Sequence, residues 1–379
     1  MPRHHLFTSE SVSMGHPDKV ADRIADAVLD HMLGHDPKAR VACEILITGK
    51  MVVVAGEITA TYEITPSLEQ IVLGTIEDVG YDKESGFDLD GAQILNRLQT
   101  QSRDIAQGVD SGGAGDQGMM FGHAARQTDD LMPLPIVLAH ALVARQAEVR
   151  TSGVVGGLRP DAKSQVTVAY DGHTPVGITS VLVSTQHDEA WDSEDPAFKA
   201  MVIDEIIRPG IGERWWKDDI EVRVNPTGRF VTGGPEGDTG VTGRKIIVDT
   251  YGGWGRHGGG AFSGKDPTKV DRSASYMARH VAKNVVAAEL ADEVEIRLSY
   301  AIGEPDPTAV SFDTYGTSRT DDADIEAFIR KYPLRPLEII DYLDLRKPIY
   351  VPTSYHGHFG RPAGDDGTFS WERVRPPED

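Results

Sequence analysis

The chain of 379 residues is long enough for two or three domains, each with a core of its own. Its 59 acidic residues outnumber its 38 lysines and arginines, and the net charge of −21 excludes a general attraction to nucleic acid or to anionic lipid. One cysteine, Cys43, excludes an internal disulfide and fits a reducing cytoplasm. The opening residues MPRHHLFTSES hold no apolar stretch, and no apolar run is long enough to cross a bilayer. We therefore expect a soluble, cytoplasmic protein without a membrane or nucleic-acid partner.

The predicted helices and strands repeat one arrangement three times. Each copy opens with a glycine-rich polar loop and continues with a helix, two adjacent strands and a second helix. The first copy has a loop at 15–19 and a helix to about residue 33, whose apolar Val20, Ile24, Val28 and Met32 recur at four-residue spacing. It continues with strands at 41–48 and 51–62, and a helix at 66–79 capped by Thr65. The second has a loop at 112–118, a helix at 134–149, strands at 165–170 and 176–185, and a helix at 196–207. The third has a loop at 258–273, a helix at 273–290, strands at 294–302 and 309–315, and a helix at 323–331.

The spacing of these copies predicts an α+β fold. Their first strands begin at residues 41, 165 and 294, a period of about 125 that suits three structurally similar domains, each a β-sheet covered by helices. We expect the domains to cover residues 1–102, 119–232 and 233–379. Residues 103–118 would form a flexible loop, because the stretch 101–118 holds five glycines and few apolar residues. This loop is either a lid or a linker.

The segment 258–273, GGGAFSGKDPTKVDRS, predicts a polyphosphate site with a metal ion. Glycines let backbone N–H groups approach a polyanion, and a helix start adds partial positive charge. Lys265 and Lys269 are four residues apart and would share one face of an early helical turn. Asp266 and Asp271 suit a divalent cation that bridges phosphate to protein. The alternative is a glycine-rich surface turn with solvated charges.

The same segment also resembles a P-loop. Residues 259–265 fit G-x-x-x-x-G-K, but Asp266 follows where a Ser or Thr would hold magnesium. A P-loop springs directly from a strand, whereas seven residues separate the nearest predicted strand, at 245–251, from Gly259. A P-loop kinase is therefore the weaker interpretation.

Several other residues have a functional and a structural interpretation. Glu44 and Glu57 interrupt apolar strands. If the hairpin turns at residues 49–50, both lie in the paired region, where they face solvent or, if buried, need a monovalent cation or an ammonium group. His16 and Asp18 at a helix start either contact phosphate and magnesium or cap the helix and complement its dipole.

Further along the chain, Arg244 and Lys245 either meet phosphate or form an exposed basic pair. Phe230 either stacks on a base or fills the core. His356 and His358 have no further ligand at zinc spacing, so we expect no structural zinc. No nucleophile–base motif is present, which favours chemistry driven by charge stabilisation and positioning.

Seven longer motifs follow one another over nearly the whole chain, from about residue 4 to residue 362. They are SESVSMGHPDKVAD, GEIT, GAGDQG, RPDAKSQVT, NPTGRFVTGGPEGDTGVTGRKIIVDTYGG, HGGGAFSGKDPTKVDRS and YHGHFGRP. Together they resemble the S-adenosylmethionine synthetase (methionine adenosyltransferase) family. The resemblance implies three related domains with pseudo-three-fold symmetry in a homo-oligomer, usually a dimer of dimers, with active sites between two subunits. It implies that ATP and L-methionine form S-adenosylmethionine, and that the tripolyphosphate is cleaved to pyrophosphate and phosphate.

The resemblance also assigns roles, motif by motif. The triphosphate contacts and catalytic residues would be His16, Lys163, Arg244, Lys245 and Lys265. The nucleotide would further be held by Asp161, Arg229, Phe230, Asp238 and Ala261. Methionine would be surrounded by Glu57, Gln101, Asp116, Asp238 and Lys269. Two magnesium ions per site would be held by Asp18 and Asp271, and potassium by Glu44.

Two features depart from the family pattern. Met14 stands where the family commonly has Glu, and the lid at 101–118 is shorter and less acidic. Two alternatives remain beside the adenosyltransferase: a P-loop-like kinase, which would release ADP, and a non-catalytic nucleotide-binding protein of the same fold.

Overall fold

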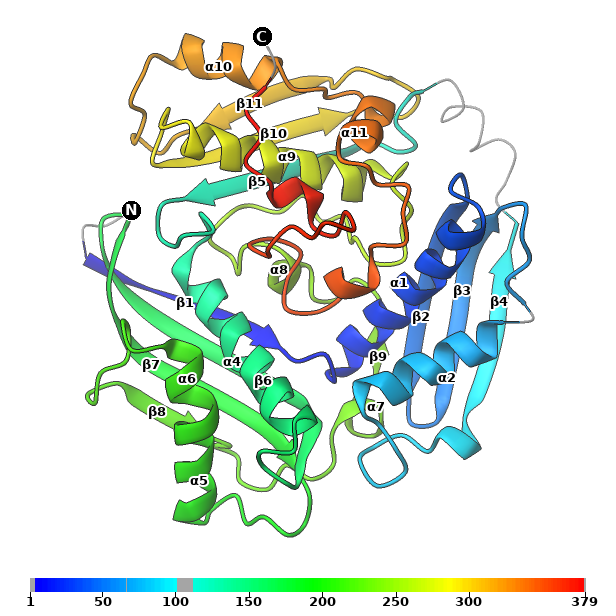
Figure 1. Cartoon of the computed structure of the whole chain (residues 1–379), viewed down its shortest axis with the longest axis vertical. Helices are drawn as coiled ribbons and strands as arrows, with labels where there is room; N and C mark the ends of the chain where they lie inside the picture. The colour runs from blue at the N-terminus through cyan, green and yellow to red at the C-terminus, as the bar shows by residue number, and fades with distance from the viewer. Residues whose placement is uncertain (1–3, 66, 101–111, 378–379) are drawn as a thin grey trace.

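The computed structural model describes residues 4–65, 67–100 and 112–377. Three β-sheets and the helices that cover them surround a central region that contains the short helix α8, Ile246–Asp249 (Figure 1). The predicted α+β fold of three similar sheet domains with pseudo-three-fold symmetry is confirmed.

The first sheet has the strand order β4-β3-β2-β9. Its strands are β2 (Arg40–Thr48), β3 (Met51–Thr59), β4 (Gln93–Gln99) and β9 (Gly240–Val241). β2 and β3 form the predicted hairpin with its turn at residues 49–50, and β4 runs parallel to β3. Helix α1 (Pro17–His35) lies against β2 and against α2 (Leu68–Val79).

The second sheet has the order β1-β6-β7-β8. Its strands are β1 (His4–Val12), β6 (Leu158–Asp171), β7 (Thr174–His187) and β8 (Glu221–Val224). Helix α4 (Leu134–Thr151) packs on β1 and β6. A second helical stretch lies beside α4 and consists of α5 (Pro196–Val202), a π-helical turn (Ile203–Ile207) and α6 (Arg208–Ile211) (Figure 1).

The third sheet has the order β11-β10-β5. Its strands are β5 (Gly118–Ala125), β10 (Glu293–Tyr300) and β11 (Ala309–Asp313). Helix α9 (Val270–Ala287) covers β5 and β10, while α10 (Asp322–Arg330) and α11 (Pro336–Tyr342) pack on α9. Short helical turns complete the chain: Leu89–Gly91, α7 (Gly234–Gly237), Val351–Thr353 and Ser370–Glu372.

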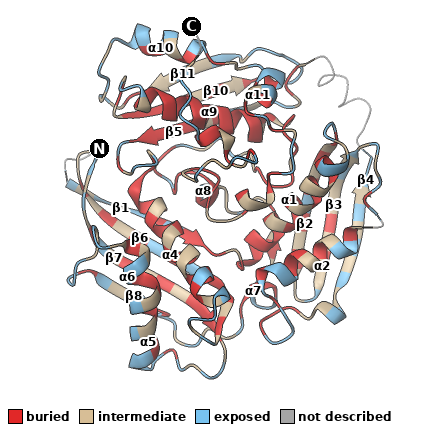
Figure 2. Ribbon diagram, viewed as in Figure 1, coloured by how far each residue is buried: buried red, intermediate tan, exposed pale blue. Residues whose placement is uncertain are grey.

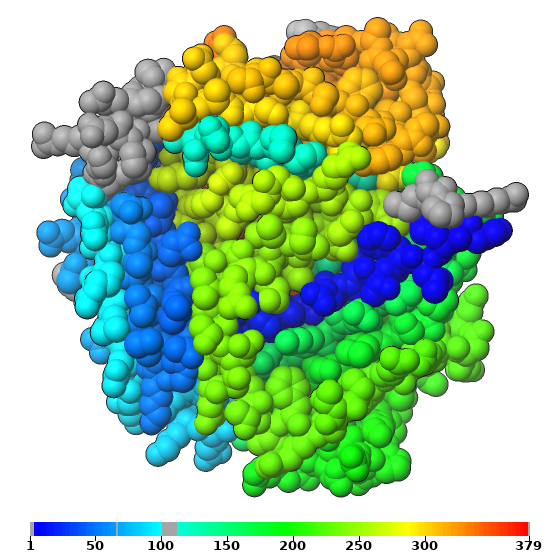
Figure 3. Space-filling view, turned by 180° about the vertical axis from the view of Figure 1, so that it is seen from behind, coloured from blue at the N-terminus to red at the C-terminus, as the bar shows by residue number. Residues whose placement is uncertain are grey.

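Each sheet contains a strand from another part of the chain. β1 pairs with β6 in the second sheet, β5 pairs with β10 in the third, and β9 pairs with β2 in the first. From behind, blue β1 therefore lies on the green second sheet, and the teal strand lies along the gold third sheet (Figure 3). The exchange runs in one direction around the molecule and closes on itself.

The three long helices α1, α4 and α9 carry buried faces toward the interior (Figure 2). On α1, the predicted stripe of Val20, Ile24, Val28 and Met32 is fully buried. Helix α9 is buried on all sides from residue 272 to residue 286, and its buried cations Arg272, Arg279 and Lys283 pair with buried acids. Cys43 is also buried in the core. No helix in the described ranges is long and apolar enough to cross a bilayer.

Three local predictions are wrong. Residues 245–251 are not a strand, because β9 takes the sheet edge at 240–241 and the β-branched run that follows turns into α8. Helix α2 was predicted to begin at residue 66 with Thr65 as its cap. It begins at Leu68, and the residue before it, Ser67, makes no side-chain capping hydrogen bond. β6 begins at Leu158 and not at 165, because Leu158 and Ala162 already pair with β7, and β1, which was not predicted, pairs with β6 from Lys163 onward.

Candidate active site

His16 caps the first turn of α1. Its Nδ1 accepts the backbone N–H of Asp18 at 3.1 Å, which is the predicted cap, and this leaves the Nε2 side of the ring for the predicted phosphate contact. Burial lowers the pKa of His16 to about 3, and the nearby ammonium groups of Lys245 and Lys163 act in the same direction. The ring is therefore neutral near pH 7, and its hydrogen is on Nε2, which can donate to a phosphate oxygen.

Asp18 joins the start of α1 to the strand exchanged from the C-terminal part of the chain. Its Oδ1 accepts the N–H of Val241 at 2.9 Å, and its Oδ2 lies 2.5 Å from Lys245 Nζ. Arg244 Nε lies 3.7 Å from Oδ1. Burial opposes ionisation of Asp18, but Lys245 and the Val241 N–H hold its pKa below the ordinary value. The predicted basic pair therefore lies directly beside the predicted magnesium ligand.

Strand β6 adds a buried acid and an exposed base to this group. Asp161 is 5% exposed, and its Oδ2 accepts the N–H of Gly234 at 2.9 Å. Its Oδ1 has no hydrogen-bond partner among the described residues. Burial raises the pKa of Asp161 to about 6, against the lowering effect of Lys163. Lys163 is exposed, two residues along the strand. We call His16, Asp18, Asp161, Lys163, Arg244 and Lys245 the α1 group.

A second group lies where α9 and β2 approach each other. Lys265 Nζ is 2.6 Å from Asp271 Oδ2. Glu44 and Glu57 occupy one face of the first sheet, because Glu57 pairs with Ala42 and Glu44 with Ala55, and both acids are exposed. The part of Glu44 that is shielded from solvent raises the pKa of its carboxyl, and the negative charges of Asp22 and Glu57 raise it further. The ammonium of Lys265 acts in the opposite direction and lowers this pKa. We call Lys265, Asp271, Glu44 and Glu57 the α9 group.

The backbone around Lys265 is used for packing and not for anion binding. The N–H of Gly264 donates to Asp26 Oδ1, that of Lys265 to the Phe262 carbonyl, and that of Asp266 to the Val41 carbonyl. A Cβ on Gly264, which has φ of +79°, would lie 2.0 Å from the Cys43 carbonyl oxygen. The prediction that these glycines expose N–H groups to a polyanion is therefore wrong for Gly264 to Asp266. They allow the segment to lie directly on β2.

The P-loop interpretation and the shared helical face also fail. Helix α9 begins at Val270, so Lys265 and Lys269 both precede it. Lys269 Nζ pairs with Asp266 Oδ2 at 2.5 Å, away from the Lys265–Asp271 pair. No strand leads into residues 259–265, since the chain before them is irregular back to α8.

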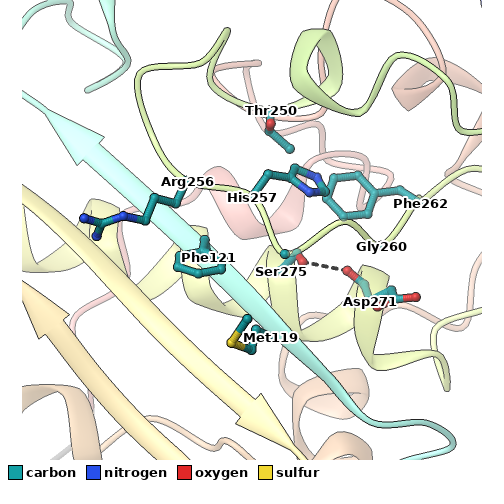
Figure 4. Close-up of a pocket in the computed structure, with 10 residues that line it drawn as sticks. Met119, Phe121, Thr250, Arg256, His257, Gly260, Phe262, Asp271 and Ser275 are labelled. Carbon is teal, nitrogen blue, oxygen red and sulfur yellow. Dashed lines mark hydrogen bonds between the residues drawn. The ribbon is translucent and has the colours of Figure 1, made fainter.

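A small pocket adjoins Asp271. Met119 and Phe121 from β5, Phe262 and His257 from the glycine-rich segment, and Arg256 line it (Figure 4). In Figure 4, Ser275 lies beside Asp271 on α9, and its Oγ donates to the Asp271 carbonyl at 2.6 Å. The pocket is lined by both apolar and polar side chains, and its acid, Asp271, belongs to the α9 group.

The other predicted site residues are more scattered. Arg229 pairs with Glu189 on the surface, Phe230 is half-buried and not in the core, and Asp238 and Asp116 are exposed. Ala261 lies against Gly243, where an added Cβ would come within 2.5 Å of the Ala261 Cβ. Gly243 comes directly before Arg244 of the α1 group, and Ala261 comes four residues before Lys265 of the α9 group. The contact between Gly243 and Ala261 therefore brings the segments of the two groups together. Gln101 lies outside the described residues.

A buried ionic layer lies under the α1 group and was not predicted from the sequence. Lys19 is 1% exposed and pairs with Asp22 and Asp249, while Asp26 pairs with Arg272. The signal was present, because α1 carries an aspartate at every fourth position from 18 to 30, on the face it turns inward.

The acids of both groups have the chemistry that Mg²⁺ needs. Within the described part of the chain, no three His, Cys, Asp or Glu side chains lie close enough to hold a metal by themselves. Mg²⁺ is usually bound by one or two carboxylates together with substrate phosphates, and Asp18 and Asp271 each present one carboxylate beside a lysine. These two acids therefore fit a metal that arrives with a phosphate ligand.

Three sheets that exchange strands, with lysine–aspartate pairs where the segments meet, define a three-domain α+β protein suited to a polyanionic ligand and a divalent cation. Comparison with protein-family models agrees with this class. The N-terminal, central and C-terminal domain models of S-adenosylmethionine synthetase match residues 4–103, 111–230 and 232–373. The chain belongs to the S-adenosylmethionine synthetase family. This confirms the resemblance, supports S-adenosylmethionine synthesis, a transferase activity, and disfavours the P-loop kinase.

Proposed function

We propose that this protein is a methionine adenosyltransferase that makes S-adenosylmethionine from ATP and L-methionine. The observation that carries the proposal is the α1 group, in which Arg244 and Lys245 lie beside Asp18, and Lys163 and Lys245 act on the neighbouring His16. Family membership supplies the substrates, and the α1 group supplies the charge that their reaction requires.

In the proposed reaction, the methionine sulfur attacks C5′ of ATP, a C–S bond forms, and the C5′–O bond to the tripolyphosphate breaks. The thioether carries no proton, so no general base is needed. His16, Lys163, Arg244, Lys245 and Lys265 would stabilise the charge of the departing tripolyphosphate, which is then hydrolysed to pyrophosphate and phosphate. Asp18 and Asp271 would each hold one of two Mg²⁺ ions, which neutralise phosphate charge when bound. Glu44 would hold K⁺.

The residues proposed to contact the nucleotide and methionine are supported by their exposure and by their hydrogen-bond partners. Asp161 Oδ1, buried and without a partner among the described residues, is suited to accept a hydrogen bond from the nucleotide. Arg229, Phe230, Asp238 and Ala261 would complete the nucleotide site. Glu57, Asp116, Asp238 and Lys269, together with Gln101, would surround methionine, and Glu57 is exposed to meet its ammonium group.

We further propose a cytoplasmic homo-oligomer, a dimer of dimers, whose active sites lie between subunits. In support, Glu44 and Glu57 are exposed on a sheet face that also carries Leu95, which is 38% exposed. On and beside the third sheet, Met119 and Ile302 are further apolar side chains left exposed, at 58% and 63%. The proposed domain boundaries are 1–102, 119–232 and 233–379, with residues 103–118 as the active-site lid.

The test is product analysis. Protein incubated with ATP, methionine, Mg²⁺ and K⁺ should form S-adenosylmethionine with equimolar phosphate and pyrophosphate, and omission of methionine should abolish product. Release of ADP would support a kinase, and nucleotide binding without turnover would support a non-catalytic member of the fold. Either result would overturn the proposal.

A further inference from the structure

A buried three-residue ion cluster lies directly under the α1 group. We propose that Lys19 is a positioning residue that fixes Arg244 and Lys245 against the start of α1, and so sets the turnover of the proposed reaction. The inference rests on the proposed function, but it concerns a residue that neither touches the ligand nor matches any assigned role.

Lys19 is inaccessible to substrate. It is 1% exposed, and its Nζ lies 2.8 Å from Asp22 Oδ2 and 2.5 Å from Asp249 Oδ1. Burial pulls the pKa of Lys19 down, but the two carboxylates outweigh it, so the ammonium stays charged. Because both partners are protein acids, Lys19 can act on a ligand only through other residues.

The two acids reach both ends of the segment that carries the basic pair. Asp22 Oδ1 accepts the N–H of Gly243 at 2.8 Å, directly before Arg244. Asp249 lies at the end of α8, and its own N–H donates to the Lys245 carbonyl at 2.9 Å. Lys19 thus connects α1 to residues just before and just after Arg244 and Lys245.

This connection aligns the groups that face the ligand. Lys19 follows Asp18 directly in the chain, and Asp18 Oδ2 contacts Lys245. The same turn of α1 therefore contacts the basic segment twice, once at the surface through Asp18 and once in the interior through Lys19. A misplacement of about 1 Å at such a site can reduce the rate about a hundredfold.

If Lys19 only stabilised the fold, an apolar side chain of similar size could take its place. Buried ion pairs add little net stability relative to well-packed apolar groups, so stability alone does not explain an ammonium at this position. The molecule also contains a matched pair remote from the basic segment. Lys283 on α9 is 7% exposed, and its Nζ lies 2.8 Å from Glu372 Oε2.

The experiment compares Lys19→Met with Lys283→Met in the full-length protein. Both substitutions remove a buried ammonium, and both should lower the urea midpoint. Only Lys19→Met should reduce kcat of the folded enzyme, by about 30-fold or more, while the ATP KM changes by less than about threefold. Its affinity for tripolyphosphate, measured by calorimetry, should fall about tenfold, while that of Lys283→Met should not change.

The outcomes separate this inference from the proposed function. If wild type and Lys283→Met both fail to make S-adenosylmethionine, the proposed function is wrong. If they are active and Lys19→Met matches Lys283→Met in kcat and in tripolyphosphate affinity, Lys19 is only structural and the inference is wrong. If Lys19→Met does not fold, Asp249→Asn takes its place, with an expected loss in kcat of about fivefold to tenfold, and an unchanged kcat would overturn the inference.

Discussion

The two lysine–aspartate pairs of the site differ in how the fold holds them. Asp18 has a side chain only 2% exposed, and it is fixed by the Val241 N–H as well as by Lys245. Asp271 is 24% exposed, and its carboxylate pairs with Lys265, which is 22% exposed. The first pair has a fully buried carboxylate at the junction of two chain segments, whereas both members of the second pair are partly solvated. Substitutions in the first should therefore change both stability and activity, and those in the second should change activity alone.

The largest effect on activity is expected at the pair of Lys265 and Asp271. Lys265→Ala should lower kcat about a hundredfold, roughly 3 kcal/mol of transition-state stabilisation, because its charge acts as the tripolyphosphate departs. The ATP KM should change less, since Lys163, Arg244 and Lys245 remain, and Lys265→Arg should recover only part of the rate. Steady-state kinetics at saturating methionine check this. A raised ATP KM with an unchanged kcat would leave Lys265 a binding role only.

The next effect tests the contrast directly. Asp18→Ala leaves the Val241 N–H and the Lys245 ammonium without their acceptor in a buried place, so the free energy of unfolding should fall by about 2 to 3 kcal/mol. Asp271→Ala should cost less than about 1 kcal/mol, because its carboxylate is partly solvated. Urea unfolding of the two variants measures both values. Equal losses would show that the two pairs are held alike.

A smaller effect is expected on the exposed sheet face. Glu57→Gln should raise the methionine KM about tenfold through the loss of a charge-assisted contact with the substrate ammonium. The free energy of unfolding should stay within about 0.5 kcal/mol of the wild-type value, because Glu57 is exposed. Glu69→Gln, at an exposed position of α2, is the control and should leave the methionine KM unchanged.

The last effect concerns the pH dependence of stability and a single acid of α1, Asp30. Burial raises the pKa of Asp30 to about 7, although its carboxylate accepts the N–H groups of Tyr350 and Val351. Between about pH 4 and pH 7 the unfolded chain loses this proton and the folded chain keeps it, so stability falls as the pH rises. The difference between wild type and Asp30→Asn should change by about 1 kcal/mol per pH unit in this range and level off above it. A pH-independent difference would contradict the raised pKa.

The sequence was informative where a pattern is local. The fourfold spacing of Val20, Ile24 and Val28 predicted the buried face of α1, and the residues at 49–50 predicted the hairpin turn, because each pattern reflects the geometry of one element. The α1 group was assembled from motifs far apart in the chain, which only the family resemblance connected.

The local predictions were wrong where contacts between distant parts of the chain determine the structure. β9 has two residues and no periodicity of its own, and its partner β2 lies almost two hundred residues earlier, so no local signal marks it. The run Ile246, Ile247 and Val248 has the composition of a strand, yet it forms a helical turn held through Asp249 and Lys19. The glycines before Lys265 are compatible with phosphate binding and with close packing, and only the positions of Cys43 and Val41 distinguish the two.

The closed exchange of strands also sets the order in which the protein can be completed during its synthesis. Residues 4–12 emerge first, but their partners at 163–171 are made some 150 residues later, and the first sheet waits for residues 240–241. At roughly 5 to 20 residues per second, β1 stays without its partner for about ten seconds or more. During that interval its edge is open to other chains, as is that of β2. A ribosome that pauses before residue 240 would therefore hold a chain with unfinished sheets, so translation speed and chaperone access bear on the yield of this protein.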